Sequence, residues 1–537
     1  MAFPRLSALL MIALAAIAAG VAPALGQQRS ATVGQAGQVG QSLDQSQTNQ
    51  LRGGTTPTNT LTTLEDETKA EDARRKARDR ARATAAAAGS PVINPRTKVA
   101  TQKPVRNLRG LGRISNKAVS IPTAVPVSTT PGAPMPGVIA PGLSDPIFPK
   151  KKKIVPEEPY APTGLRLGGI KVLPAIESAA GYDSNALRSS SGTKTKGSRL
   201  YQVTPELSLQ SDWSRHALQF DLRGSYSYYA DVDNANRPNL DAKLTLRGDV
   251  KTDSVVTLEL KEKVDSQRPG SADLSSAVKG RPLYYVTSGS LGWAEKFGYA
   301  TVTATGTIDR SDYQDGTTFS GGTLSQKDRN YTAYGGKLRG AYELSPGISP
   351  FVEVSADTRS YDEKVDTSGY RRSSVGVVAK VGTTLELTRT LTGEVSVGWG
   401  ARNYDDTRLA NLTGAVVDTS LIWQLSPVTK ATLKAGTEFA ETSQGGSSGA
   451  LGRKVSLEVA HDLLRNLTIT STAGFARADY QGISRIEDTI NAGLKLDYRI
   501  DRNFVVRSSY AFDRALSSTA GQSNLSHTFL MGLRVQR

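Results

Sequence analysis

The sequence predicts an all-β fold: a transmembrane antiparallel β-barrel of 16 to 18 strands, preceded by a disordered segment that holds one short helix. Two observations lead to this prediction. Apolar and polar residues alternate with a period of two along much of residues 166–537, as in strands with one apolar and one wet face. Short and long connections also alternate there, as they do at the two rims of a membrane-spanning barrel.

The chain opens on the pattern of a secretory signal peptide. Arg5 precedes an apolar run at residues 6–19, and small residues follow at Ala24 and Gly26, which is the order of a signal peptide and its cleavage site. Gly20 and Pro23 keep the run below the ~20 residues that a spanning helix needs. We therefore expect residues 1–26 to be removed on export.

Residues 27–165 have the composition of a disordered segment. Of the 25 prolines, 17 fall within residues 1–165, which also hold 21 Lys and Arg against 10 Asp and Glu. Such a Pro- and Ala-rich basic sequence buries too little apolar area to offset its chain entropy. Residues 64–88 differ, because acids precede bases among strong helix formers and predict a polar helix. No aromatic interleaving accompanies the bases, so we expect no nucleic-acid partner.

The alternation is clearest at residues 218–228. Even positions there are apolar, aromatic or Gly, and odd positions are polar or charged. The pattern returns at 240–247, 256–261, 375–382 and 490–498, and many strands are 10 to 14 residues long. Ordinary strands average about 5 to 6 residues, whereas strands that cross a membrane need about 9 to 11. The strand length therefore favours a membrane barrel.

The connections allow the strands to be counted. Eight short connections fall at residues 211–215, 251–254, 293–296, 344–347, 387–390, 425–428, 461–466 and 499–502. Nine longer stretches rich in Gly, Ser, Asp and Asn lie near 183–199, 231–238, 266–281, 310–328, 360–370, 404–412, 441–452, 478–487 and 514–525. These connections join 18 strands and place both ends of the barrel at the rim of short turns.

Aromatic residues gather towards the ends of the predicted strands. The residues near short turns are Trp213, Trp293, Phe297, Trp423 and Phe504, and those towards the long loops are Tyr228, Tyr285, Tyr361 and Tyr404. Aromatic rings favour the two interfaces of a membrane. We therefore expect two outward-facing aromatic girdles.

The start of the predicted barrel carries a recognisable pattern of residues. It consists of Pro174, Tyr182, Asp183, Asn185, Pro205, Trp213, Arg215 and His216. Two proline-containing strands, a Tyr-Asp-x-Asn loop entry and a Trp-x-Arg-His turn make residues 170–537 resemble the type 2 β-barrel porin family of Gram-negative outer membranes. The resemblance implies a barrel of unassigned substrate in the outer membrane, in contact with its lipid and with the barrel-assembly machinery. One departure is the last residue, Arg537, where such barrels usually end in an aromatic residue.

The composition argues against an enzyme or a metal protein. The chain has no Cys and 3 His, which excludes disulfides and thiolate metal sites. Alternation places His216, His461 and His527 in the lipid-facing set, away from the acids that would orient a catalytic histidine. We expect no catalytic residue, no metal and no cofactor.

The inward face carries charges of both signs. The candidate pore-lining residues are Arg223, Lys243, Arg247, Glu259, Lys261, Lys263, Lys337, Arg339, Glu353, Lys380, Glu394, Lys434, Glu438 and Lys495. A barrel of 16 to 18 strands is too wide for side chains to fill, and the opposed signs nearly cancel, so weak ion selectivity is expected.

These features favour passive diffusion of small hydrophilic solutes through an outer-membrane barrel. The first alternative is a component for polysaccharide export, which aromatic ladders on the inward face would support; that face is expected to be poor in aromatics. The second is a structural tether, in which residues 27–165 lie in the periplasm and contact the cell wall. Gated uptake with a folded plug is less favoured, because residues 27–165, which we call the leader, have the composition of a disordered segment.

Overall fold

The computed structural model describes residues 159–190, 195–269, 271–275, 277–386 and 390–537. The expected signal peptide at 1–26, the helix near 64–88 and the segment from 27 to 158 lie outside the described residues. Among the described residues, no helix is long and apolar enough to cross a membrane.

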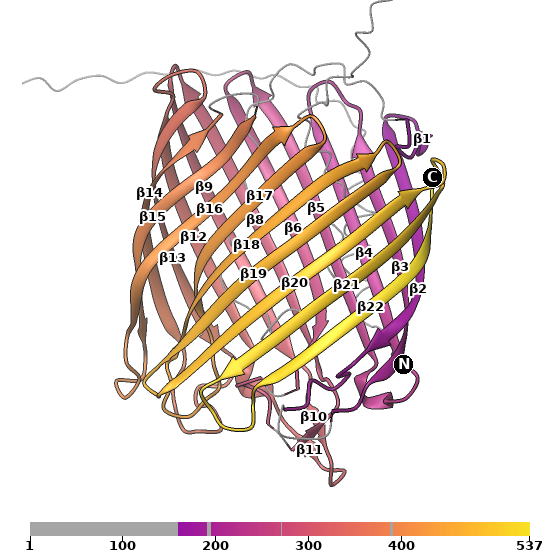
Figure 1. Ribbon diagram of the computed structural model, residues 1–537. Coiled ribbons are helices and arrows are strands. Elements are labelled where there is room, and N and C mark those ends of the chain that lie inside the picture. Colours follow the sequence, from indigo (N-terminus) through magenta and orange to yellow (C-terminus); the bar gives the residue numbers. More distant parts are fainter. Residues whose placement is uncertain (1–158, 191–194, 270, 276, 387–389) are drawn as a thin grey trace, which may run out of the picture. The chain divides into compact units, whose positions relative to one another are not determined.

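Eighteen long strands form one antiparallel sheet that closes on itself (Figure 1). Each has 12 to 16 residues, as their alternating sequences predict. The strands are β2 (Ile170–Asp183), β3 (Ser198–Ser211), β4 (Ala217–Tyr229), β5 (Arg237–Lys251), β6 (Ser254–Ser266), β8 (Leu283–Phe297), β9 (Ala300–Tyr313), β12 (Tyr331–Tyr342), β13 (Ile348–Tyr361), β14 (Ser374–Leu385), β15 (Leu391–Tyr404), β16 (Leu412–Ser426), β17 (Thr429–Ala440), β18 (Gly449–Leu464), β19 (Leu467–Gln481), β20 (Arg485–Arg499), β21 (Phe504–Ser517) and β22 (Asn524–Gln536). Pairing of β22 with β2 completes the barrel, which confirms the predicted fold class.

Minor elements decorate this barrel. The short strand β1 (Leu165–Leu167) pairs with β2 at the rim of short turns. At the other rim, β7 (Val278–Lys279), β10 (Gly316–Thr318) and β11 (Thr323–Leu324) form a small separate sheet. Figure 1 shows β10 and β11 beyond the rim of long loops, and the C-terminus at the opposite rim. Two 3₁₀ turns, η1 (Asp233–Ala235) and η2 (Lys327–Arg329), lie in long loops.

Short and long connections alternate as the sequence predicts, with small differences in position. Strand β8 continues through the turn expected at 293–296 and ends at Phe297. The chain reverses one residue later, because Gly298 adopts a left-handed φ of 60° that favours glycine. The connection expected near 478–487 shortens to residues 482–484, since β19 and β20 pair up to Tyr480 and Arg485.

The register of the sheet determines which residues face inward. Arg359 of β13 donates a hydrogen bond to the carbonyl of Phe439 in β17, over three intervening strands, which is possible on the concave inner side. Residues that pair directly across two strands lie on the same face of the sheet. The inward position of Arg359 therefore assigns the inward residues of every other strand through the pairings. Leu244 and Leu260 are direct partners on the outer face, while Thr245 and Glu259 are partners on the inner one. The predicted alternation is thereby confirmed.

The aromatic girdle at the short turns is confirmed. Trp213, Trp293, Phe297, Trp423 and Phe504 are 41% to 63% exposed on the outer surface. At the other rim, Tyr228 faces outward and is 45% exposed. The prediction was wrong for Tyr361 and Tyr404, which share the inward face of Arg359 and Arg402 and pack among residues inside the barrel.

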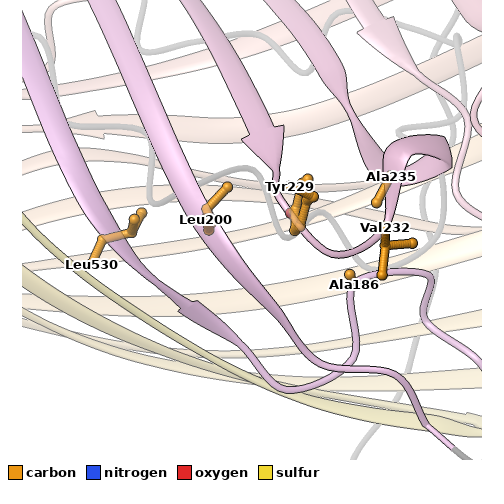
Figure 2. Packing of buried hydrophobic residues seen from close by; sticks show 6 residues of the cluster. All are labelled: Ala186, Leu200, Tyr229, Val232, Ala235 and Leu530. Carbon is orange, nitrogen blue, oxygen red and sulfur yellow. The ribbon is translucent and has the colours of Figure 1, made fainter.

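A hydrophobic cluster lies inside the rim of long loops. Figure 2 shows its six side chains, which come from β3, β4 and β22 and from two loops: Ala186, Leu200, Tyr229, Val232, Ala235 and Leu530. Leu200, Tyr229 and Ala186 are fully buried. The cluster packs the β2–β3 and β4–β5 connections against the inner wall, so these loops narrow the mouth of the barrel.

Candidate functional site: the lumen and its narrowed mouth

The inner wall carries the predicted charged residues, and most of them are paired. Of the fourteen candidate lining residues, thirteen lie within ion-pair distance of an opposite charge. Lys434 has no such partner among the described residues, and it is exposed. Pairing keeps each charge on the wall close to neutralised, which lowers the net field along the lumen.

Glu353 is the centre of the largest network. It is 3% exposed, and its carboxylate lies 3.0 Å from Lys380 Nζ, 3.6 Å from Arg339 Nη1 and 3.8 Å from Lys337 Nζ. Arg339 continues to Glu394 at 2.6 Å. The network thus links the inward faces of β12, β13, β14 and β15.

A second network lies where the barrel closes. Arg507 of β21 pairs with Glu177 of β2 and with Asp497 of β20, at 2.7 Å for the latter. Arg534 of β22 reaches Glu206 of β3 across β2. Charge-assisted bonds of this kind are stronger than neutral ones, so side chains reinforce the ladder between the first and last strands.

The connection from β6 to β8 crosses the mouth of the barrel. We call residues 267–282 the crossing loop; its residues 270 and 276 lie outside the described part. Asp273 Oδ1 accepts hydrogen bonds from Thr442 Oγ1 at 2.7 Å and from Ser443 N at 2.8 Å. Thr442 and Ser443 follow β17, and β18 lies nine strands from β6 in the cycle of eighteen. The crossing loop therefore reaches the opposite wall.

Further contacts fix the crossing loop. Ala272 packs against Ala440, Ala450 and Tyr480 of that opposite wall. At its start, Arg268 donates to Asn524 Oδ1 of β22 at 2.6 Å. The loop is thus held from several directions, and it divides the mouth.

The far wall bends inward to meet the crossing loop. We call residues 437–452 the hairpin end. Strand β17 pairs with β16 only as far as Gly436 and Asp418, and beyond this point it pairs with β18 alone. Phe439 then packs inside the barrel in a cluster with Leu412, Val416 and Leu451. Arg359 holds the hairpin end in place through the carbonyl of Phe439 and the carboxylate of Glu441.

Two inward glycines make room for the hairpin end. A Cβ on Gly400 would lie 2.3 Å from the ring of Phe439, and one on Gly414 would lie 2.7 Å from Leu451. Glycine in a strand often marks such a close approach. These glycines were the signal in the sequence for the inward fold, because strict alternation alone places Phe439 on the lipid face.

Inward tyrosines line the same rim. Tyr284 and Tyr313 stack at 6.0 Å between ring centres, and Tyr331 and Tyr361 lie 5.2 Å apart. The four belong to consecutive strands β8, β9, β12 and β13. The expectation of an inward face poor in aromatics was therefore wrong at this rim. All four rings are at most 8% exposed.

The three histidines lie away from the charged networks. The rings of His461 and His527 bond to Thr429 Oγ1 and Tyr510 Oη, each at 2.9 Å. His216 Nδ1 accepts a hydrogen bond from the backbone N of Asp249 at 3.2 Å. The geometry offers these rings hydroxyl and backbone partners rather than an orienting carboxylate.

The architecture defines a class of protein. A closed antiparallel barrel with an even strand number, one rim of short turns, an apolar exterior and a charged interior is an outer-membrane β-barrel. The sequence model of the family described as putative beta-barrel porin 2 matches residues 158–537. The chain belongs to this family, and it is an outer-membrane barrel of the porin kind.

Other comparisons are more distant. No curated protein matches the chain significantly. Among solved structures, the ferric citrate transporter FecA in its unliganded form aligns at 11% identity with a TM-score of 0.36, over 67% of this chain and 63% of FecA, less than two thirds of its length. OccK2 (OpdF) of Pseudomonas aeruginosa aligns at 11% identity with a TM-score of 0.36, over 68% of this chain and 96% of that one. OpdK of the same organism aligns at 11% identity with a TM-score of 0.35, over 68% and 99%.

Proposed function

We propose that the protein is a porin for passive diffusion of small hydrophilic solutes, with weak ion preference along the wall of the lumen. The observation that supports this most directly is the balance of inward charge. Glu353, for example, faces three cationic side chains, and Lys380 among them also contacts Asp418 at 2.7 Å. A wall of paired charges is polar enough to be wet and nearly neutral overall.

Conductance of the purified protein in a planar bilayer tests this function. We expect steady conductance. In a variant whose arginines at the long-loop mouth are replaced by neutral residues, we also expect a small reversal potential in a salt gradient. A correctly folded barrel that is silent in the bilayer would overturn the proposal. Migration on a gel that changes with heating reports folding independently of conductance.

Export of a polysaccharide is the second candidate, and the tyrosine rings favour it. Tyr284, Tyr313, Tyr331 and Tyr361 form a row of the kind on which sugar rings stack. The rings are buried beneath loops and the hairpin end, so a polymer would reach them only after those segments move. Soluble oligosaccharides that block the current in wild type, but not after Tyr331→Ala, would favour this candidate over simple diffusion.

The leader belongs to the same proposal. Both ends of the barrel lie at the rim of short turns, which faces the periplasm in barrels of this class. We place residues 27–165 in the periplasm on this ground, where contact with the cell wall would make the barrel a tether. Insertion by the barrel-assembly machinery is the expected route to the membrane. Cross-linking of the leader to peptidoglycan in intact cells tests the contact with the wall.

A further inference from the structure

Four arginines converge on one side of the narrowed mouth. Arg188 lies in the β2–β3 connection, Arg237 begins β5, and Arg268 and Arg281 lie near the two ends of the crossing loop. Arg188 forms an ion pair with Asp183 at 2.8 Å. Its Nη1 also donates to the carbonyl of Asn185, while Arg281 Nη2 donates to the next carbonyl, that of Ala186, at 2.6 Å. Adjacent carbonyls thus hold two guanidinium groups side by side.

The two arginines of the crossing loop have neutral partners. Arg268 is 8% exposed and donates to the side-chain oxygen of Asn524 at 2.6 Å. Arg281 Nε is buried without a hydrogen-bond acceptor. Among the described residues, no carboxylate lies within ion-pair distance of either guanidinium. A buried cation without a counter-charge is unfavourable, and an anion bound here would supply that counter-charge.

The charges around Arg268 and Arg281 are also mainly positive. Burial, with smaller contributions from the charges of Arg237 and Arg188, lowers the pKa of Arg281 to about 9. Burial likewise lowers the pKa of Arg268 to about 10, again with a contribution from Arg188. The acids on this side are Asp183, which Arg188 already engages, Glu487, which pairs with Arg485, and Asp513. Positive charge is therefore in excess at this point of the mouth.

Backbone strain accompanies the cluster. Arg188 has a φ of 55°, and it is the one described residue other than glycine with a positive φ. The left-handed conformation is unfavourable for a residue with a side chain. Ala186 is packed into the hydrophobic cluster of Figure 2, which holds the loop in this shape. Strain that the surroundings maintain in this way is common at ligand sites.

We propose that Arg188, Arg268 and Arg281 form a binding site for the oxyanion of a small solute, a carboxylate or a phosphate, at the long-loop mouth of the pore. The inference rests on the proposed function, and it places the preference for anions at the mouth rather than along the paired wall. Two oxygens of a carboxylate or of a phosphate accept hydrogen bonds from the paired N–H donors of a guanidinium group. Its binding supplies the counter-charge that Arg268 and Arg281 lack.

The test compares wild type with the double variant Arg268→Gln/Arg281→Gln in planar bilayers. We expect wild type to prefer chloride over potassium, and inorganic phosphate or succinate added at the long-loop side to reduce its current. The double variant loses two unit charges near the path of the ion, and its chloride to potassium permeability ratio should fall about fivefold. Arg514→Gln is the matched control, because Arg514 is exposed on the lipid face of β21, and its ratio should stay at the wild-type value.

Several outcomes separate this inference from the proposed function. A conducting, folded double variant with the wild-type ratio and the wild-type response to phosphate would overturn the anion site and leave the porin standing. A silent wild-type barrel would count against the porin. Thermal unfolding in inorganic phosphate would then test the anion site. Phosphate that stabilises wild type but not the double variant would support the anion site, and equal stabilisation of the two proteins would overturn it. If the double variant does not fold, Arg281→Gln alone and the charge-conserving Arg281→Lys replace it.

Discussion

Asp273 Oδ1 accepts a hydrogen bond from Thr442 Oγ1 at 2.7 Å, although 169 positions separate the two residues in the chain. The same carboxylate oxygen accepts from Ser443 N and Oγ. Asp273 lies in the crossing loop, and its partners lie on the opposite wall. One side chain therefore ties together two segments that narrow the mouth from opposite sides.

Removal of this side chain should widen the mouth. Asp273→Ala deletes three hydrogen bonds to a charged acceptor, which weakens docking of the crossing loop by about 1 to 3 kcal/mol. The strand ladders do not involve Asp273, so thermal unfolding of the barrel should change little. Single-channel conductance should rise, and proteases should cut the loop faster. Asp253→Ala, in the turn between β5 and β6, is the control; equal conductance in both variants and wild type would contradict the role of the loop.

The alternation of faces makes a second prediction. Leu244 lies on the outer face between Phe220 and Leu260, and Thr245 follows it on the inner face. Leu244→Arg places a charge in lipid near the middle of the strand and should cost about 2 to 4 kcal/mol, whereas Thr245→Arg meets the wet lumen and should be tolerated. Unfolding titrations in lipid vesicles measure both. Equal losses would mean that the two faces are assigned wrongly.

Alternation made the barrel predictable from the sequence, and it failed where the chain leaves the barrel surface. Leu244 and Thr245 obey it because lipid and water act on every strand in the same way. Phe439 does not, because β17 leaves β16 beyond Gly436 and turns its former lipid face onto Gly400. The position of Tyr361 near a long loop predicts an outward ring, whereas its spacing of two residues from Arg359 on the same strand predicts the inward ring that the structure has. The crossing loop depends on contacts such as Asp273 with Thr442, and no local pattern encodes a pair so far apart.

The leader should be dispensable for folding of the barrel. Deletion of residues 27–160 removes a segment whose composition cannot form a core, and every strand from β1 onward is retained. We expect the shortened protein to keep heat-modifiable migration and wild-type resistance to unfolding. A deletion that extends to residue 183 removes β2 and its pairing with β22, and should abolish both properties. Failure of the shorter deletion to fold would show that the leader has a structural role.

One exposed ion pair predicts a local response to acid. Hydrogen bonds from the side chain and backbone of Arg199 lower the pKa of Asp231 to about 2, against an ordinary value of 3.8. Because the pKa is lowered in the folded state, the contact is fully present above the ordinary value and is lost as pH falls through the folded one. Carbon NMR of the Asp231 carboxyl in micelles should give a midpoint near 2, and Arg199→Gln should raise it towards 3.8. A midpoint that Arg199→Gln leaves unchanged would show that the pair does not form in solution.

The lumen wall makes the last prediction. Lys261 contacts Glu259, and Lys337 and Arg339 contact Glu353, so each of these cations offsets a specific acid. Replacing Lys261, Lys263, Lys337 and Arg339 together by Gln removes four positive charges from the inner wall. Glu259 then keeps only Lys243 and Glu353 keeps only Lys380 as ion-pair partners, so the wall becomes more negative. Reversal potentials in a salt gradient should then shift towards cations, and the shift should shrink at high salt because the new charges are screened. Substitutions of matched size on the lipid face, such as Leu258→Gln and Leu260→Gln, should leave the preference unchanged. A folded quadruple variant with wild-type preference would place the path of ions away from this wall, and the crossing loop and hairpin end would then enclose the conducting route alone.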